Sequence, residues 1–258
     1  MQQILISLGA FGASEVRRHG QLWFAKLAKA AGADGVEVRG ELLVDAQREL
    51  PALAQAARAG GWALVYSSPE GLWTPQGALD TQALACALDA AQALGAPRLK
   101  MSIGGFGAGS ADTFAPLAQS LADCGIELLI ENDQTVAAGT IAPLRSFFDQ
   151  AQAAGLPLGM TFDMGNWHWT GECALEAARA VGPRVAYVHC KGVQRQPQRW
   201  VAVPLADSAA PWRTALRLLP RGVPWAIEYP LQGDDLLAVT REQVALLREV
   251  AATLGDPA

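Results

Sequence analysis

Residues 153–163, AAGLPLGMTFD, join a helix-like stretch to a strand-like stretch through one glycine, Gly155. Glycine adopts the left-handed conformation that closes a helix without the steric cost other residues incur, so the chain can turn into the next strand. The same arrangement recurs along the chain as an Ala/Leu-rich amphipathic stretch, a glycine and a β-rich stretch. The glycines that occupy this position are Gly32, Gly60, Gly95, Gly125, Gly155, Gly182 and Gly222. We therefore expect a left-handed helix end and a helix-to-strand turn at each of them.

These turns, together with the apolar run at residues 4–8, predict eight strands. We place them at residues 2–8, 35–39, 62–67, 97–102, 126–131, 158–163, 184–190 and 224–229. Strands that alternate with helices indicate a parallel sheet, and eight such units in 258 residues match a closed (β/α)8 TIM barrel. The alternative is an open doubly wound sheet. Such a sheet normally carries G-x-G-x-x-G after its first strand, and residues 9–14 lack that motif.

The composition predicts one soluble, cytoplasmic domain spanning residues 1–258. Hydrophobic residues make up 51% of the chain, enough for a core of ordinary size, and no linker divides it. The N-terminal segment lacks the features of a signal peptide, and no apolar run approaches membrane-spanning length, so we expect no membrane partner. A net charge of −5 without a basic stripe argues against nucleic acid. The expected partner is a small molecule, and homo-oligomerisation is left open.

Four residues able to bind a divalent cation each follow a strand-like apolar run directly. They are Glu131 after Ile-Glu-Leu-Leu-Ile, Asp163 after Gly-Met-Thr-Phe, His189 after Val-Ala-Tyr-Val, and Glu228 after Trp-Ala-Ile. The carboxyl ends of barrel strands meet at one mouth, where barrel enzymes keep their active sites. Carboxylates crowded there take up protons unless a cation compensates their charge. The pattern therefore predicts a metal centre, and three oxygen donors with one imidazole suit Mn²⁺, with Mg²⁺ or Co²⁺ as alternatives.

Simpler interpretations exist for each of these residues. A single glutamate after a strand is commonly a solvated loop residue or the partner of an arginine, and a single histidine can be a packed core residue. All four residues lie at the ends of separate predicted strands, and this favours the metal centre over the simpler interpretations.

The chain resembles the xylose-isomerase-like barrels, which include ketose 3-epimerases, hydroxypyruvate isomerases and inosose dehydratases. The resemblance rests on LLIEN at residues 128–132, TFDMGN at 161–166, VHCKGVQR at 188–195 and IEY at 227–229. In the epimerase branch a Glu, an Asp, a His and a second Glu hold the metal in that chain order, which implies these roles for the four residues above. Arg195, six residues beyond His189, matches a substrate-binding arginine. Asn166 stands where the epimerases often have histidine, so the substrate is left open. Residues 30–39 and 162–169 are also similar to proteins assigned as epimerases in bacterial keto-sugar-acid utilisation.

The expected chemistry is proton transfer next to a sugar carbonyl. A divalent cation bound to the carbonyl oxygen and a neighbouring hydroxyl lowers the barrier to removing the proton between them, through an enediolate. With Glu131 and Glu228 on opposite sides of the sugar, one glutamate removes the proton and the other returns one to the opposite face, which is epimerisation. Return of the proton to the adjacent carbon gives aldose–ketose isomerisation. We therefore expect a sugar isomerase or epimerase acting on a ketose or keto-sugar acid.

Other polar residues near the predicted strand ends are candidate contacts for substrate hydroxyl or carboxylate groups, with surface salt bridges as their simpler role. They are Glu37, Arg39, Lys100, Lys191 and Arg195, joined by Asn166 and His168 from the loop after the sixth strand.

Three other functions remain open. A DNA-repair enzyme resembling endonuclease IV would need several metals and a basic face, whereas this chain has three histidines and is acidic. A dehydratase could use the same metal centre, because the enediolate can expel a hydroxyl at the next carbon. A sugar-binding barrel without turnover is the non-enzymatic alternative, and turnover of any keto-sugar by the pure protein would exclude it.

Overall fold

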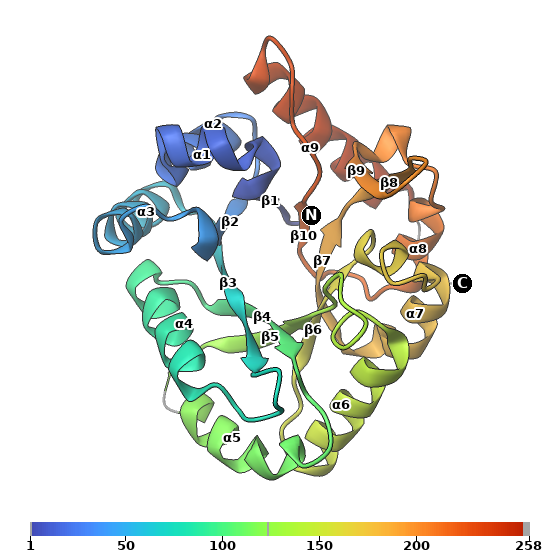
Figure 1. Cartoon of the computed structure of the whole chain (residues 1–258). Coiled ribbons are helices and arrows are strands. Elements are labelled where there is room, and N and C mark those ends of the chain that lie inside the picture. The colour runs from blue at the N-terminus through green and yellow to red at the C-terminus, as the bar shows by residue number, and fades with distance from the viewer. Residues whose placement is uncertain (1, 123, 255–258) are drawn as a thin grey trace.

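The computed structural model describes residues 2–122 and 124–254 and contains a closed barrel of parallel strands, seen along its axis in Figure 1. In barrel order the strands are β1 (Ile4–Ser7), β2 (Gly35–Arg39), β3 (Ala63–Trp73), β4 (Arg98–Gly104), β5 (Glu127–Glu131), β6 (Gly159–Asp163), β7 (Val185–Cys190) and β10 (Trp225–Ile227). Strand β1 pairs with both β2 and β10, so the sheet has no open edge. This closure confirms the predicted TIM barrel and rules out the open doubly wound sheet.

Helices surround the barrel and cover the outer faces of its strands (Figure 1). They are α1 (Ala13–His19), α2 (Gln21–Ala30), α3 (Ala46–Gly60), α4 (Thr81–Leu94), α5 (Phe114–Ala122), α6 (Ile141–Ala153), α7 (Ala174–Val181), α8 (Trp212–Leu218) and α9 (Leu236–Thr253). Within the described ranges, none of these helices combines the length and apolar character needed to cross a bilayer.

The turn glycines mostly adopt the predicted conformation. Positive φ angles occur at Gly32, Gly95, Gly125, Gly155 and Gly222. The prediction was wrong at Gly60, which is the last residue of α3, because the helix continues one residue further and Gly61 takes the left-handed conformation with a φ of 62°. It was also wrong at Gly182, which has a φ of −49° and begins a 3-10 turn that carries the chain from α7 into β7.

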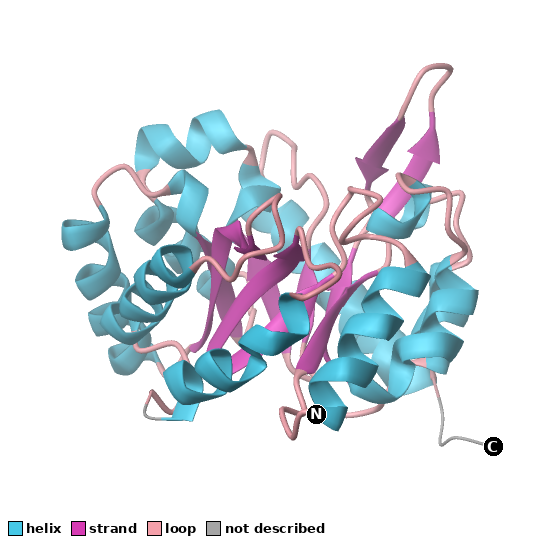
Figure 2. Ribbon diagram, turned by 60° about the horizontal axis from the view of Figure 1, so that its bottom comes forward, coloured by secondary structure: helices cyan, strands magenta, loops and turns pink. Residues whose placement is uncertain are grey.

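The predicted strand boundaries lie within two residues of the observed ones except at the end of β3. That strand was expected to end at residue 67 and instead continues to Trp73. An irregularity between Ser67 and Gly71 shifts its register, so that Gly71 and Trp73 still pair with β4. A further feature was not predicted: β8 (Gly192–Arg195) and β9 (Trp200–Val203) form an antiparallel hairpin directly after β7. Figure 2 shows this hairpin extending beyond the barrel, at the end away from the N-terminus.

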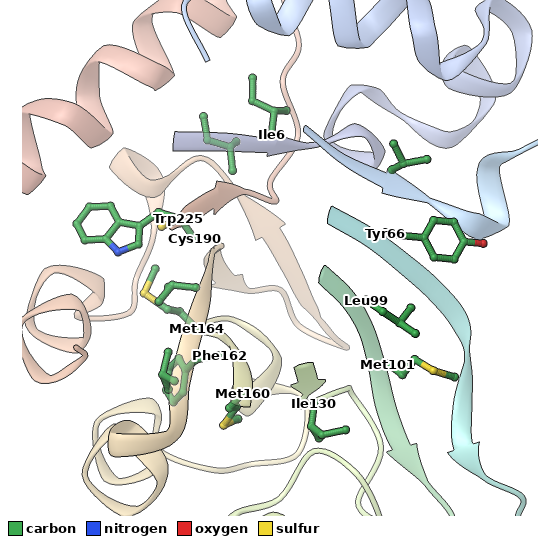
Figure 3. Packing of buried hydrophobic residues seen from close by; sticks show 14 of the residues in the cluster. Ile6, Tyr66, Leu99, Met101, Ile130, Met160, Phe162, Met164, Cys190 and Trp225 are labelled. Carbon is green, nitrogen blue, oxygen red and sulfur yellow. The ribbon is translucent and has the colours of Figure 1, made fainter. Parts of the chain in front are cut away.

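Alternate residues of each strand point outward and inward. Outward side chains such as Ile6, Ile130 and Phe162 pack in the apolar layer between the barrel and the helices (Figure 3). Inward side chains near the N-terminal ends of the strands form a separate apolar cluster, which we call the lower layer: Leu5, Val65, Leu129, Tyr187 and Ala226. Two residues further along the same strands lie polar residues, which we call the upper layer: Ser7, Ser67, Glu131, His189 and Glu228. The period of two along a strand therefore places polar groups at the C-terminal mouth.

Candidate functional site

The four predicted metal ligands lie together at this mouth. Glu131 and Asp163 end β5 and β6, His189 is in β7, and Glu228 follows β10 directly; these four strands are neighbours in the barrel. One potential ligand atom from each residue lies within 4.8 Å of the others, and we call these four residues the metal-ligand group. The structure thus brings together, at one point, residues that are as many as 97 positions apart in the sequence, from Glu131 to Glu228.

His189 presents its two ring nitrogens to different partners. Its Nδ1 faces the other three residues of the metal-ligand group. It lies 2.7 Å from Glu228 Oε2, 3.0 Å from Glu131 Oε1 and 3.9 Å from Asp163 Oδ2. Its Nε2 lies 2.7 Å from Oε2 of Glu37, which is fully buried in β2. Metal-binding histidines usually donate their other ring nitrogen to a carboxylate in this way, which fixes the tautomer and the orientation of the ring. The donor set therefore fits a divalent cation held by Nδ1 and three carboxylates.

A buried lysine balances the charge on one side of the group. Lys100 Nζ lies 2.8 Å from Glu131 Oε2 and 3.3 Å from Glu37 Oε1, and its side chain is only 1% exposed. Burial raises the pKa of Glu131, but the charges of Lys100 and His189 outweigh burial and lower it. Glu131 is therefore ionised, and its other oxygen, Oε1, faces Nδ1 of His189.

Two cations hold Glu228 on the other side. Arg39 Nη1 lies 2.6 Å from Glu228 Oε1, and Lys191 Nζ lies 2.9 Å from Glu228 Oε2. Burial raises the pKa of Glu228, but the charges of His189 and Lys191 reverse this and hold it well below its ordinary value. Burial likewise opposes charge on His189, whereas Glu228 and Glu37 raise its pKa well above the usual range.

Asp163 is fixed by backbone donors and by Lys191. Its Oδ1 accepts hydrogen bonds from the backbone N–H groups of Gly165 and Asn166, and its Oδ2 lies 2.6 Å from Lys191 Nζ. The Asn132 side chain bonds both the N–H and the carbonyl of Asp163, which anchors the strand end. Burial is the largest influence on the Asp163 carboxyl and, with the nearby Glu228, raises its pKa to about 7 despite Lys191.

Together these contacts form a ring of alternating charge around His189. The order is Glu131, Lys100, Glu37, Arg39, Glu228, Lys191 and Asp163. Three cationic side chains therefore neutralise much of the charge of these carboxylates. The ring also keeps the carboxylate oxygens oriented towards Nδ1 of His189.

The residues predicted to contact substrate fall into two groups. Glu37 and Lys100 lie buried beneath the metal-ligand group, and Asn166 and Lys191 lie beside Asp163; Asn166 already bonds Asn132, Gln134 and Lys191. Arg39 contacts Glu228, but the structure does not bring His168 and Arg195 to the group. His168 lies in the short turn after β6, with its ring 4.9 Å from that of Trp200. Arg195 is exposed on the β8–β9 hairpin, 5.4 Å over the ring of the same Trp200.

A cavity of about 400 Å³ opens onto this site. Glu228 and Lys191 line its inner part, and Arg17, Arg39 and Glu41 line the part towards α1 and the end of β2. The segment after β1 contributes only small residues to its wall, including Gly9 and Ala13. A larger surface groove of about 680 Å³ along α6 contains none of the metal-ligand group. Arg17 was not identified from the sequence, because nothing in its local pattern separates it from its neighbour Arg18.

The sequence was compared with protein families and with curated proteins. Residues 25–250 match the model of a family described as xylose isomerase-like TIM barrel. The comparison with curated proteins found no match.

Many solved structures share the fold. A xylose isomerase domain protein from Alicyclobacillus acidocaldarius is 18% identical, with a TM-score of 0.68 over 98% of this chain and 99% of that one. D-psicose 3-epimerase from Clostridium cellulolyticum is 13% identical, with a TM-score of 0.69 over 97% and 99% of the two chains. A probable 3-DHS dehydratase from Bacillus anthracis is 11% identical, with a TM-score of 0.70 over 96% and 99%. At these identities the likeness concerns the fold.

Proposed function

The chain belongs to the xylose isomerase-like TIM barrel family, and from this we propose that it is a divalent-metal-dependent sugar isomerase or epimerase. Its substrate is a ketose or a keto-sugar acid, and the reaction passes through an enediolate. The observation that carries the proposal is the arrangement of Glu131 and Glu228, which approach Nδ1 of His189 as part of one buried donor group that can hold a metal. Soluble sugar substrates reach such a group through the cavity that Glu228 lines.

The residues that would hold the cation are Glu131, Asp163, His189 and Glu228. Three oxygen donors and one imidazole favour Mn²⁺, with Mg²⁺ or Co²⁺ as alternatives. When bound, the cation would stabilise the negative charge that develops on the oxygens of the enediolate. Glu37 supports this arrangement because its bond to Nε2 keeps Nδ1 of His189 directed at the carboxylates.

We assign proton removal to Glu131. A general base must be ionised. Lys100 holds Oε2 of Glu131 at 2.8 Å and favours its ionised form, while Oε1 lies 3.0 Å from Nδ1 of His189. Lys100 thus acts as a positioning residue that orients the base without contacting the reacting carbon.

We assign proton return to Glu228. Both of its oxygens already have cationic partners, Arg39 at 2.6 Å and Lys191 at 2.9 Å, and its pKa is held lower than that of a free glutamate. Glu228 is therefore ionised in the free site and must take up a proton from solvent before it can return one to the enediolate. In this assignment the two glutamates lie in unequal surroundings and take unequal roles.

A dehydratase is the second candidate. One structural neighbour carries the description of a probable 3-DHS dehydratase, and an enediolate formed at the same site could expel a hydroxyl from the adjacent carbon. Loss of water from the product separates dehydration from epimerisation and isomerisation. Product mass, measured for a set of ketoses and keto-sugar acids, therefore distinguishes the two.

The proposal is tested with Glu131→Gln and Glu228→Gln, which keep the side-chain shape but remove the proton-accepting charge. Each should lower turnover by roughly a hundredfold or more. Glu127→Gln is a matched control, because Glu127 begins the same strand and pairs with Arg98 far from the site. Native enzyme in D₂O should introduce deuterium next to the carbonyl. Product without solvent deuterium would indicate hydride transfer and refute the two-glutamate mechanism.

Metal analysis completes the test. Native protein should retain about one Mn²⁺-like ion per chain, and Asp163→Ala should lose it while Glu127→Gln keeps it. Equal metal content in native and Asp163→Ala proteins would show that the proposed centre is wrong. Metal binding without turnover of any sugar would support the non-catalytic sugar-binding barrel instead.

A further inference from the structure

The charges that line the cavity are unequally compensated. Arg39 makes ion pairs with Glu37, Glu41 and Glu228, and Lys191 makes ion pairs with Asp163 and Glu228. Arg17 also lines the cavity, but it makes no ion pair with any residue of the described chain. Among the cavity's cationic side chains, it alone keeps a charge that the described residues do not neutralise.

Arg17 is exposed and is anchored by one hydrogen bond. One of its terminal nitrogens, Nη2, donates to the backbone carbonyl of Glu41 at 3.0 Å, which leaves the other guanidinium N–H groups for a ligand. Helix α1, which carries Arg17, lies beside the strands β1 and β2 (Figure 1). Gly9, Gly12 and Ala13 line the same wall, so no bulky side chain of that segment fills the space between Glu228 and Arg17.

We propose that Arg17 binds an anionic group at the end of the substrate remote from Glu131 and Glu228. This inference rests on the proposed function, since it names the class of sugar that the same site accepts: a ketose with a carboxylate or a phosphate at its far carbon. A guanidinium pairs with a carboxylate through two parallel N–H···O bonds, and it also binds phosphate. The favoured substrate is the keto-sugar acid, because the planar fork of Arg17 matches a planar carboxylate.

Arg195 is the competing assignment. The family resemblance makes it the substrate-binding arginine, yet it lies on the hairpin, stacks over Trp200 and, unlike Arg17, does not line this cavity. The two assignments predict different variants to be defective, so one experiment decides between them.

The experiment compares three six-carbon ketoses that differ only at carbon 6: the neutral ketohexose, its 6-carboxylate (a ketohexuronate) and its 6-phosphate. Catalytic efficiency is measured with the Mn²⁺-loaded enzyme. Arg17→Ala should lower efficiency on the 6-carboxylate by about 10-fold or more, since a hydrogen bond to a charged group is worth about 1.5–3 kcal/mol. Its efficiency on the neutral ketohexose should stay within about twofold. Arg18→Ala, a change in the next residue of the same helix, is the matched control and should change neither.

The conservative variant Arg17→Lys distinguishes a carboxylate from a phosphate at the far end of the substrate. Lysine keeps the charge but not the fork, so Arg17→Lys should retain efficiency on a phosphate better than on a carboxylate. If native enzyme strongly prefers the 6-phosphate and Arg17→Lys preserves that preference, the far group is a phosphate, and the anion subsite stands with that identity. An equal loss on all three sugars with Arg17→Ala would overturn the subsite, as would a charge-selective loss with Arg195→Ala.

A binding measurement separates this inference from the proposed reaction. A sugar that binds the folded protein raises its unfolding midpoint, whether or not it is turned over. Suppose that the native protein converts none of the sugars, and that the ketohexuronate stabilises the native protein but does not stabilise Arg17→Ala. The proposed reaction then fails and the Arg17 subsite holds. If the sugars are converted but no anionic sugar binds better than the neutral one, the reaction holds and the subsite fails.

Discussion

The lower and upper layers inside the barrel differ in nearly every respect, although five strands contribute to both. On β5, Leu129 belongs to the apolar lower layer and Glu131, two residues later, to the charged upper layer. The same step separates Tyr187 from His189 on β7, and Ala226 on β10 from Glu228, which follows that strand directly. A rigid apolar layer therefore fixes the backbone from which each functional side chain projects.

The difference shows how a barrel keeps buried charges. The lower layer needs no polar partners, whereas the carboxylates of the upper layer are stabilised by cations from outside that layer, Arg39, Lys100 and Lys191. Removal of one partner from such a set leaves a buried charge uncompensated, which is more costly than the loss of the pair itself. We therefore expect substitutions in the lower layer to affect stability alone and substitutions in the upper layer to affect metal binding and turnover as well as stability.

The substitution with the largest expected effect is Leu129→Ala, which should lower stability without changing metal binding. Leu129 is fully buried in the lower layer, and truncation of such a leucine costs about 2–5 kcal/mol in the free energy of unfolding. Urea unfolding measures this loss, and the exposed Val136→Ala serves as a control that should change it by less than about 0.5 kcal/mol. The metal content of the folded fraction should stay unchanged. Metal loss from folded Leu129→Ala would mean that the two layers are not independent.

Glu37→Gln should have the next largest effect. Glu37 supports His189 through Nε2, and loss of such a supporting carboxylate lowers metal affinity by about 10- to 100-fold. Titration of the metal-free protein with Mn²⁺ measures the affinity. Glu41→Gln is the matched control, because Glu41 also binds Arg39 but does not contact His189. Equal affinity in the two variants would show that Glu37 does not act through His189.

The parts of the barrel that could be predicted from the sequence are those set by local pattern. The glycine at the end of a helix and the period of two along a strand depend on neighbouring residues, so the strands and the metal-ligand group could be placed in advance. Residues 192–195 and 200–203 also have a strand-like pattern around a proline-containing turn. That signal, read as a hairpin, could have identified β8 and β9.

The ring of charge could not be predicted, because its contacts cross the barrel. The Glu37–His189 pair spans 152 positions and the Arg39–Glu228 pair spans 189. Which cation meets which carboxylate depends on the stagger of strands around the closed barrel, and no local pattern encodes that stagger. Glu37, Arg39 and Lys100 were therefore recognised as polar residues at the C-terminal mouth of the barrel, but not as partners of the predicted metal ligands.

The smallest effect should come from Tyr187→Phe, which tests where the boundary between the layers lies. The Tyr187 hydroxyl is buried and has no hydrogen-bond partner among the described residues, while its ring packs 5.2 Å from the ring of His189. Burial, together with the charges of Glu37 and Glu228, raises the pKa of Tyr187 well above its ordinary value, so the hydroxyl stays neutral. Removal of an unpaired hydroxyl with the ring kept in place should change the free energy of unfolding by less than about 0.5 kcal/mol. Urea unfolding of Tyr187→Phe and Leu129→Ala compares the free energy of unfolding of two variants within the lower layer. A loss above about 1 kcal/mol, accompanied by weaker Mn²⁺ binding, would show that Tyr187 donates to Glu37, and the upper layer would then extend on β7 to Tyr187, two residues before His189.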